Sequence, residues 1–330
     1  MKQLTAVALV LLNVVITFQS YAQFNYNQPK ELGNVKWHRD YDKAITLAKK
    51  EQKDILILFQ EVPGCSTCRN YGHNVLSNPL MVEAIENLFI PLAIYNNKGG
   101  KDKIILDKFN EPSWNNPVVR IINTKGRNVV SRISGDYSAK TLQKSMVEAL
   151  QSYGKTIPDY LELLGQELSA SGKSKDKFFK MYCFWTGEKQ LAKVDGVLST
   201  QSGFMNGEVV KVTYDSSVVD EATLDSYAKL HSFKPVDNNE AYRPASNDIH
   251  YYLRHTDYRY VPLTELQQTK INSAIGSGKT GDKYLSPKQR AWFVKIIEGK
   301  EKKEKNLLNI PFKDAWDYMM RELPSFIASK

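Results

Sequence analysis

The residues with the most specific chemistry in this sequence are its three cysteines, Cys65, Cys68 and Cys183. Cys65 and Cys68 form a Cys-x-x-Cys pair, a spacing too short for a long structural cross-link. Thiols at this spacing are typical of pairs that cycle between the reduced and the disulfide state. The odd count leaves one thiol over, which is open to oxidation unless it is buried or used. We therefore predict redox chemistry rather than a disulfide scaffold.

The segment before Cys65 has the pattern of a buried strand. Residues 54–59 (DILILF) form a continuous run, apolar after its first residue, as in a central strand covered on both faces. A helix is predicted to begin near Arg69, so Cys65 would lie at a helix N-terminus. Unpaired N–H groups and the positive end of the helix dipole lower the pKa of a thiol there. Cys65 is thus the predicted nucleophile and Cys68, one turn later, the resolving thiol.

The elements around this pair follow a recognisable order. A helix is predicted at 41–51, further strands at 88–95, 118–122 and 128–133, and a closing helix at 139–153. This order resembles the thioredoxin superfamily over about residues 35–153. The VPGC-x-x-C stretch resembles a thioredoxin-like group in which VPG precedes a cysteine or selenocysteine. The resemblance implies a thioredoxin fold in which Pro117, just before a strand, is cis and faces the Cys-x-x-Cys pair.

A Cys-x-x-Cys pair can also be half of a zinc site. Such a site needs two further ligands, and the sequence has no second Cys-x-x-Cys and no paired histidines at ligand spacing. We expect neither a metal nor another cofactor.

Cys183 begins a second series of residues whose order is informative. The series comprises Cys183-Phe184-Trp185, Glu188, residues 195–200 (DGVLST), 203–207 (GFMNG) and 208–215 (EVVKVTYD), and then Asp237 and Tyr242-Arg243. It resembles peptide methionine sulfoxide reductase A, which carries GCFWG-x-E, PGV-x-ST, GY-x-GG, E-x-V-x-V-x-YDP and D-x-x-x-x-Y-R in the same order. The predicted fold class is therefore α/β, a thioredoxin fold followed by an α+β two-layer domain of this reductase type.

The chemistry of sulfoxide reduction gives roles to two of these residues. A thiolate attacks the sulfoxide sulfur, and the oxygen must be protonated as it leaves. The resemblance implies that Cys183 is the nucleophile, which becomes a sulfenic acid as methionine is released. It implies that Glu208 is the general acid, kept protonated by a partly apolar pocket. The alternatives are a buried structural thiol for Cys183 and a solvent-facing carboxylate for Glu208.

Four further residues receive binding roles from the same resemblance. Phe184 and Trp185 would form the apolar wall for the S-methyl group of the substrate. Asp237 and Tyr242 would hold a water molecule or the sulfoxide oxygen by hydrogen bonds, and the alternative for these two is an ordinary loop.

The sequence departs from the family pattern at two places. The family usually has a long insertion, which carries another tyrosine, between the GY-x-GG turn and the catalytic glutamate. Here Gly207 runs directly into Glu208, and Tyr182 replaces the glycine before the nucleophile. A shorter, rebuilt pocket could change the substrate or the rate.

The cysteine count links the two predicted sites. A sulfenic acid at Cys183 needs a second thiol to release water and form a disulfide. Residues 177–330 hold no other cysteine. We therefore predict that Cys65 attacks Cys183, that Cys68 resolves the mixed disulfide, and that an external thiol reductant then reduces Cys65–Cys68. The predicted substrate is oxidised methionine in a protein or peptide.

The first residues indicate export. Lys2 precedes a mostly apolar stretch at 4–18, and Ser20-Tyr21-Ala22 places small residues at a cleavage site before Gln23. This is the layout of a signal peptide over residues 1–22, and the alternative is an uncleaved anchor. We expect a periplasmic or extracellular protein in an oxidising compartment. The predicted divisions are a thioredoxin-like domain at 23–155, a helical linker at 156–176 and a reductase-like domain at 177–330.

Composition limits the remaining classes. A chain of 330 residues is too long for one typical core. The formal charge is +9, but the densest basic run, at 300–305, is interleaved with Glu301 and Glu304. This favours a solvated helix face over a nucleic-acid-binding patch. No later stretch approaches the roughly 18 apolar residues of a membrane span, so no membrane embedding is expected after signal cleavage.

Two rival functions stay open from the sequence. In the first, the chain is a thiol–disulfide oxidoreductase whose C-terminal domain only recognises a partner, so Cys65 and Cys68 are essential and Cys183 is dispensable. In the second, it is a non-enzymatic exported binding protein in which none of the cysteines is reactive. Ser66-Thr67 stands in place of the usual Gly-Pro and leaves the redox potential open.

Overall fold

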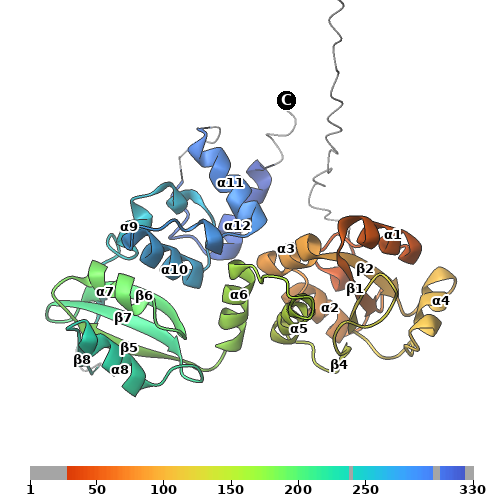
Figure 1. The fold of residues 1–330 in the computed structure, drawn as a ribbon, viewed down its shortest axis with the longest axis horizontal. Helices are drawn as coiled ribbons and strands as arrows, with labels where there is room; N and C mark the ends of the chain where they lie inside the picture. Colours follow the sequence, from red (N-terminus) through yellow and green to blue (C-terminus); the bar gives the residue numbers. More distant parts are fainter. Residues whose placement is uncertain (1–27, 238–240, 300–304, 324–330) are drawn as a thin grey trace, which may run out of the picture.

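The computed structural model describes residues 28–237, 241–299 and 305–323. Figure 1 shows two sheet-containing lobes and a group of C-terminal helices beside them. The predicted signal peptide at 1–22 and most of the basic run at 300–305 lie outside the described residues. Within the described ranges, no helix is both long enough and apolar enough to span a bilayer.

The first sheet has four strands in the order β2-β1-β3-β4. They are β1 (Asp54–Gln60), β2 (Phe89–Tyr95), β3 (Val118–Ile122) and β4 (Ile133–Ser134). β1 is parallel to β2 and antiparallel to β3, which is antiparallel to β4. The strand predicted at 128–133 is wrong for most of its length, because only an isolated bridge from Asn128 to Ile122 precedes β4.

Helices cover both faces of this sheet, which is why β1 is a continuous apolar run. The helices are α1 (Tyr41–Glu51), α2 (Ser66–Asn74), α3 (Pro79–Leu88), α4 (Lys101–Lys108) and α5 (Ala139–Gln151). Ile55 and Ile57 pack in one apolar cluster with α1 and α4, whereas Leu56 and Leu58 pack in another with α2, α3 and α5. This arrangement is the one expected for a thioredoxin fold over residues 35–153.

The predicted linker at 156–176 is a packed helix for much of its length. α6 (Asp159–Ser169) buries Tyr160, Leu161 and Leu164 in the same apolar cluster as α3 and α5. The next strand begins at Ser174, so the boundary predicted at residue 177 falls inside a strand.

The second sheet is antiparallel and has five strands in the order β8-β5-β7-β6-β9. They are β5 (Ser174–Lys180), β6 (Val197–Phe204), β7 (Glu208–Asp215), β8 (Lys234–Val236) and β9 (Arg243–Pro244). Helices α7 (Phe184–Leu191) and α8 (Glu221–Leu230) pack on one face, against Phe179, Val210 and Val212. The two layers match the α+β domain expected after the first.

The C-terminal helices lie above the second sheet and extend toward α6 (Figure 1). They are α9 (Tyr251–Arg254), α10 (Glu265–Gly276), α11 (Pro287–Ile297) and α12 (Phe312–Glu322), with short 3-10 turns at Asp257–Tyr260 and Asp282–Tyr284. A further 3-10 turn, Lys30–Leu32, precedes α1 in the first lobe. Capping boxes begin α10 at Thr264 and α11 at Ser286. Ile271, Trp292 and Met319 belong to the apolar cluster that also contains the first lobe's core. The predicted second domain therefore contains helices that share a core with the first.

Polar contacts fix these helices to both lobes. The backbone N–H of Lys288 in α11 donates to Oε1 of the fully buried Glu83 in α3, at 2.8 Å. On the other side, Lys270 and Ser273 of α10 donate to the carbonyls of Ala192 and Lys189, both at 2.7 Å. The C-terminal helices thus join the two sheets into one body.

Ile271→Ala should lower the free energy of unfolding by about 2–5 kcal/mol, because Ile271 is fully buried and its truncation leaves a cavity in the shared core. The matched control is Ile297→Ala, whose side chain is 54% exposed and which should change stability by less than about 0.5 kcal/mol. Urea unfolding followed by tryptophan fluorescence measures both. Equal losses in the two variants would contradict the shared core.

Candidate active sites

Cys65 occupies the N-cap of α2, directly after β1 and its following loop. Its side chain is exposed. The pKa of Cys65 is lowered, chiefly because its thiolate accepts a hydrogen bond from the backbone N–H of Cys68, with further bonds from the Cys68 thiol and Thr67. Cys65 is therefore placed as the sequence predicts for the attacking thiolate.

Cys68 has the opposite environment. It is fully buried, and this burial raises the pKa of its thiol to about 12, with a further contribution from Cys65. The two sulfur atoms are 3.6 Å apart, within reach of disulfide formation after a small shift. One thiol of the pair is thus exposed and ionisable, and the other is buried and holds its proton.

Neighbouring residues shape the loop between β1 and α2. The N–H of Gly64 donates to Oε1 of Glu31 at 2.9 Å. A Cβ at position 64 would lie 2.7 Å from the Cβ of Cys68 and 2.4 Å from the carbonyl oxygen of Glu61, so only glycine fits. The Glu61 carboxylate and both sulfur atoms lie within 4.8 Å of one another. No motif in the sequence indicated that Glu61 would lie beside the cysteine pair.

The Asn116–Pro117 bond is cis, as predicted, and Pro117 is buried. β3 begins at the next residue, and its register pairs Val118 with Phe59. Pro117 therefore lies beside the end of β1, at the sheet edge from which the Cys65 loop departs.

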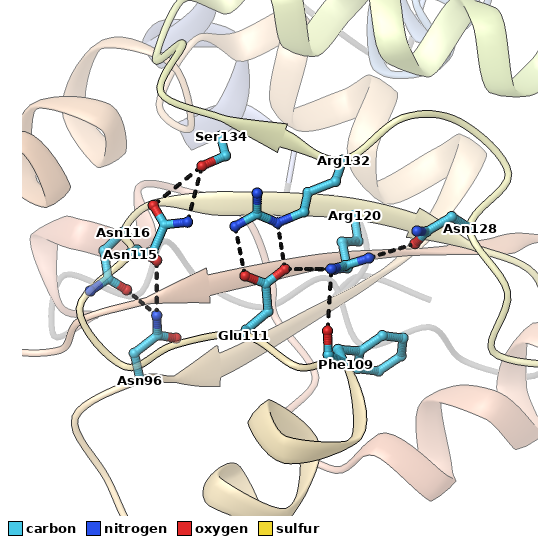
Figure 2. A network of polar contacts seen from close by, with 9 residues as sticks. All are labelled: Asn96, Phe109, Glu111, Asn115, Asn116, Arg120, Asn128, Arg132 and Ser134. Atoms are coloured by element: carbon cyan, nitrogen blue, oxygen red, sulfur yellow. Dashed lines mark hydrogen bonds and ion pairs between the residues drawn. The ribbon is translucent and has the colours of Figure 1, made fainter.

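A polar network, shown in Figure 2, holds the segment before Pro117. The buried carboxylate of Glu111 accepts from Nε of Arg120 at 2.7 Å and from Nε and Nη2 of Arg132 at 2.6 and 2.8 Å. Asn115 bonds Ser134 of β4 at 3.1 Å, and Asn116 accepts from Asn96 at the end of β2. These contacts tie the segment to three strands of the first sheet.

Cys183 also occupies a helix N-cap, that of α7. Its side chain is partly buried, and the preceding Tyr182 is 99% exposed. Glu208, the first residue of β7, accepts a hydrogen bond at Oε2 from the backbone N–H of Phe184 at 2.8 Å. The structure thus brings the predicted nucleophile and the predicted acid to the same helix N-terminus, although they are far apart in sequence.

Aromatic side chains lie beside this N-terminus. The Phe184 ring meets Trp185 and Phe204 edge-on, with centroids 6.1 and 5.6 Å away. Trp185 stacks on Tyr251 of α9 at 3.9 Å and donates through Nε1 to Asp248 at 3.1 Å. Phe184 and Trp185 thus lie together at the helix that follows Cys183, and Tyr251, which no motif indicated, stacks on Trp185; their role in binding substrate stays a prediction.

Glu188 connects the elements that carry this wall. Its carboxylate is fully buried and accepts from the N–H of Ser202 in β6 at 2.9 Å and from that of His250 at 3.0 Å. Burial raises the pKa of Glu188 to about 8 and lowers that of His250 to about 4. His250 directly precedes α9, so Glu188 holds Tyr251 in place against Trp185.

Two residues predicted at the Cys183 site are elsewhere. The ring centroids of Tyr242 and Phe178 are 5.4 Å apart, and both residues belong to one apolar cluster with Val209. Phe179, the next residue after Phe178 in β5, belongs instead to the cluster that contains Phe184. Neighbouring strand residues face opposite sides of a sheet, so Tyr242 lies on the face away from α7. Its hydroxyl donates to the carbonyl oxygens of Gln201 and Ser202, at 3.1 and 3.0 Å.

Asp237 is exposed and follows β8. The register of β8 on β5 runs from Lys234 opposite Lys180 to Val236 opposite Phe178. β8 therefore leads away from the end of β5 that precedes Cys183, and Asp237 does not join the site.

The structure also separates the two cysteine sites. Figure 1 shows α2, which carries Cys68, and α7, which follows Cys183, on opposite sides of α6. In this arrangement, Cys65 and Cys183 of one chain are therefore not placed for the direct attack predicted from the cysteine count.

At pH 7, iodoacetamide should alkylate Cys65 much faster than Cys68. The rate at Cys65 should rise with pH through its lowered pKa and then level off, while Cys68 stays protonated below about pH 12. Peptide mass spectrometry after timed quenching measures both rates, and protein unfolded in urea is the control in which the rates converge. Equal rates in the folded protein would contradict this assignment.

Two family models match the chain. A thioredoxin-like family matches residues 36–124, and the peptide methionine sulfoxide reductase family matches residues 175–229. The first match contains Cys65, Cys68 and Pro117, and the second contains Cys183 and Glu208.

Similar proteins match only in part. Peptide methionine sulfoxide reductase MsrA of Methanococcus maripaludis strain C7 is 39% identical over 70 residues, covering 16% of this chain and 43% of that protein. MsrA of strain C6 is 47% identical over 36 residues, covering 11% of this chain and 23% of that protein. The chain thus spans less than half the length of either relative.

Solved structures similar to the chain include a thioredoxin from Thermus thermophilus, with 18% identity and a TM-score of 0.32 over 36% of this chain and 90% of that one. DsbH oxidoreductase has 14% identity and a TM-score of 0.31 over 39% of this chain and 94% of that one. From the family matches, the chain carries a thioredoxin-like domain at its N-terminal side, followed by a peptide methionine sulfoxide reductase domain.

Proposed function

We propose that this protein is a thiol-dependent peptide methionine sulfoxide reductase in which Cys183 is the nucleophile and the Cys65/Cys68 pair supplies the regenerating thiols. The observation that carries the proposal is the hydrogen bond of the Glu208 carboxyl to the N–H of Phe184, one residue from Cys183. This bond supports the proposal because it keeps a carboxyl group near a thiol at a helix N-terminus, where a thiolate is favoured.

The reaction follows from these groups. The S-methyl group of the substrate packs against Phe184 and Trp185, and the Cys183 thiolate attacks the sulfoxide sulfur. Because Oε2 of Glu208 accepts the N–H of Phe184, we assign proton delivery to Oε1. The oxygen moves from the substrate to Cys183, which leaves methionine and a cysteine sulfenic acid.

Regeneration requires the first domain. A thiolate at Cys65 attacks the sulfenic acid, releases water and forms a Cys65–Cys183 disulfide. Cys68 then attacks the Cys65 sulfur and frees Cys183, with Glu61 placed to take the Cys68 proton. An external thiol reductant restores the Cys65–Cys68 pair.

We further propose that the protein works outside the cytoplasm on oxidised methionine in exported proteins or peptides. The support is the signal-peptide pattern of residues 1–22. An oxidising compartment both damages methionine and demands a dedicated thiol supply for repair.

A second function is favoured by one observation. The lowered pKa of Cys65 and the raised pKa of Cys68 equip this pair for thiol–disulfide exchange without Cys183. In that case the second domain serves to recognise a partner.

Residues 23–330 should reduce a methionine sulfoxide peptide with excess dithiothreitol, and Cys183→Ser should abolish turnover because the attacking sulfur is gone. The control is Cys65→Ser/Cys68→Ser, which should keep turnover because dithiothreitol replaces the first domain. Methionine formation is followed by liquid chromatography. Turnover that survives in Cys183→Ser, or none in the wild type, would leave the exchange function as the better account.

Glu208→Gln should lower kcat by about 10²- to 10⁴-fold with a smaller change in KM, because the amide keeps the shape but cannot deliver the proton. Glu221→Gln is the matched control, since this carboxylate pairs with Lys177 and its side chain is 60% exposed. The same peptide assay measures both variants. A Glu208→Gln enzyme with wild-type kcat would rule out the acid role.

A further inference from the structure

The proposed relay requires a bond between two sulfur atoms that this fold keeps apart. A disulfide needs sulfur atoms about 2 Å apart and Cα atoms within about 7 Å. Cys65 caps α2 in the first lobe and Cys183 caps α7 in the second, and α6 lies between these helices in Figure 1. The sequence contains no thiol besides these two and Cys68.

Helix α6, which connects the two lobes, is packed too closely against its neighbours to act as a simple hinge. On α6, the carbonyl of Leu161 accepts from Gln143 of α5 at 2.9 Å, within the shared apolar cluster. The C-terminal helices bridge the lobes a second time, through Glu83 with Lys288 and through Lys189 with Ser273. Bringing α2 to α7 in one chain would break these contacts between the lobes and the C-terminal helices.

Both thiol sites are nevertheless open to another molecule. Cys65 is exposed, and Trp114, in the segment that ends at Pro117, is 80% exposed. Tyr182, directly before Cys183, is 99% exposed. Large aromatic side chains exposed to this degree are available for contact with a partner surface.

We propose that Cys65 of one molecule regenerates Cys183 of a second copy of the same chain. In this complex, the surface that carries Cys65 and Trp114 contacts the surface of the second copy that carries Tyr182 and Cys183. The occupant is a second copy because this chain itself carries the dithiol that the Cys183 site lacks. The proposal rests on the reductase function proposed above.

The electron balance of the step closes within the two copies. The Cys65 thiolate of the first copy attacks the Cys183 sulfenic acid of the second, a proton is taken up, and water leaves as the intermolecular disulfide forms. Cys68 of the first copy loses its proton and attacks the Cys65 sulfur, so Cys183 leaves as a thiolate. Two electrons have passed from the dithiol to Cys183, and an external dithiol reduces Cys65–Cys68.

A mixing experiment without added reductant tests the relay. Reduced Cys65→Ser/Cys68→Ser protein, given sulfoxide peptide, should release one methionine per Cys183 and stop. Addition of reduced Cys183→Ser protein, which cannot turn over sulfoxide, should restart release at a rate proportional to its concentration. Cys183→Ser protein alkylated with iodoacetamide is the control and should have no effect. Failure of the reduced partner to restart release would overturn the proposal.

A trapping experiment separates the two routes directly. Cys68→Ser protein with sulfoxide peptide should form a Cys65–Cys183 disulfide that runs as a dimer on a non-reducing gel and is assigned by mass spectrometry. The same disulfide in a monomer band, or none at all, would overturn the proposal. Turnover of the Cys65→Ser/Cys68→Ser protein with dithiothreitol reports the reductase function separately, so its failure is distinguishable from failure of the relay.

The contact face has its own test. Trp114→Ser in the Cys183→Ser partner should slow the restart about tenfold, as expected for loss of an aromatic anchor at an interface. Ile104→Ser is the control, because Ile104 is also exposed, at 64%, but lies on α4. An unchanged rate with Trp114→Ser would overturn the assignment of this face.

Discussion

The apolar core shared by the first lobe, α6 and the C-terminal helices is the constraint on which the rest of this structure depends. It contains Leu56 and Leu58 of β1 together with Ile271, Trp292 and Met319 of the C-terminal helices. Because burying these side chains together is favourable, the shared core fixes the position of the two lobes relative to each other. The same packing places α9 against α7 and keeps the two cysteine sites on opposite sides of α6.

Both sites use the same local device. In each, a strand is followed by a short loop and then by a helix whose N-cap is a cysteine, Cys65 for α2 and Cys183 for α7. The groups around each cysteine then differ. Cys65 is paired with a buried thiol, which suits electron transfer through a disulfide, whereas Cys183 is beside a carboxyl group and aromatic rings, which suit an oxidised thioether.

The aromatic wall near Cys183 is assembled from three separate elements. Trp185 comes from α7, Phe204 from β6 and Tyr251 from α9. The buried Glu188 joins these elements through backbone N–H groups of β6 and of the residue before α9. The turn from β6 to β7 is short, and the C-terminal helices supply the tyrosine beside Trp185.

The sequence by itself determined what depends on local pattern: the buried run of β1, the position of Cys65 at a helix N-terminus, and the cis bond before Pro117. Apolar periodicity and motif spacing record such features because they act over a few residues. Only the tertiary structure decided that Tyr242 faces away from α7, since strand register sets the face of each side chain. It also placed Tyr251 on Trp185 and separated the cysteine sites, because long-range packing leaves no local signal in the sequence.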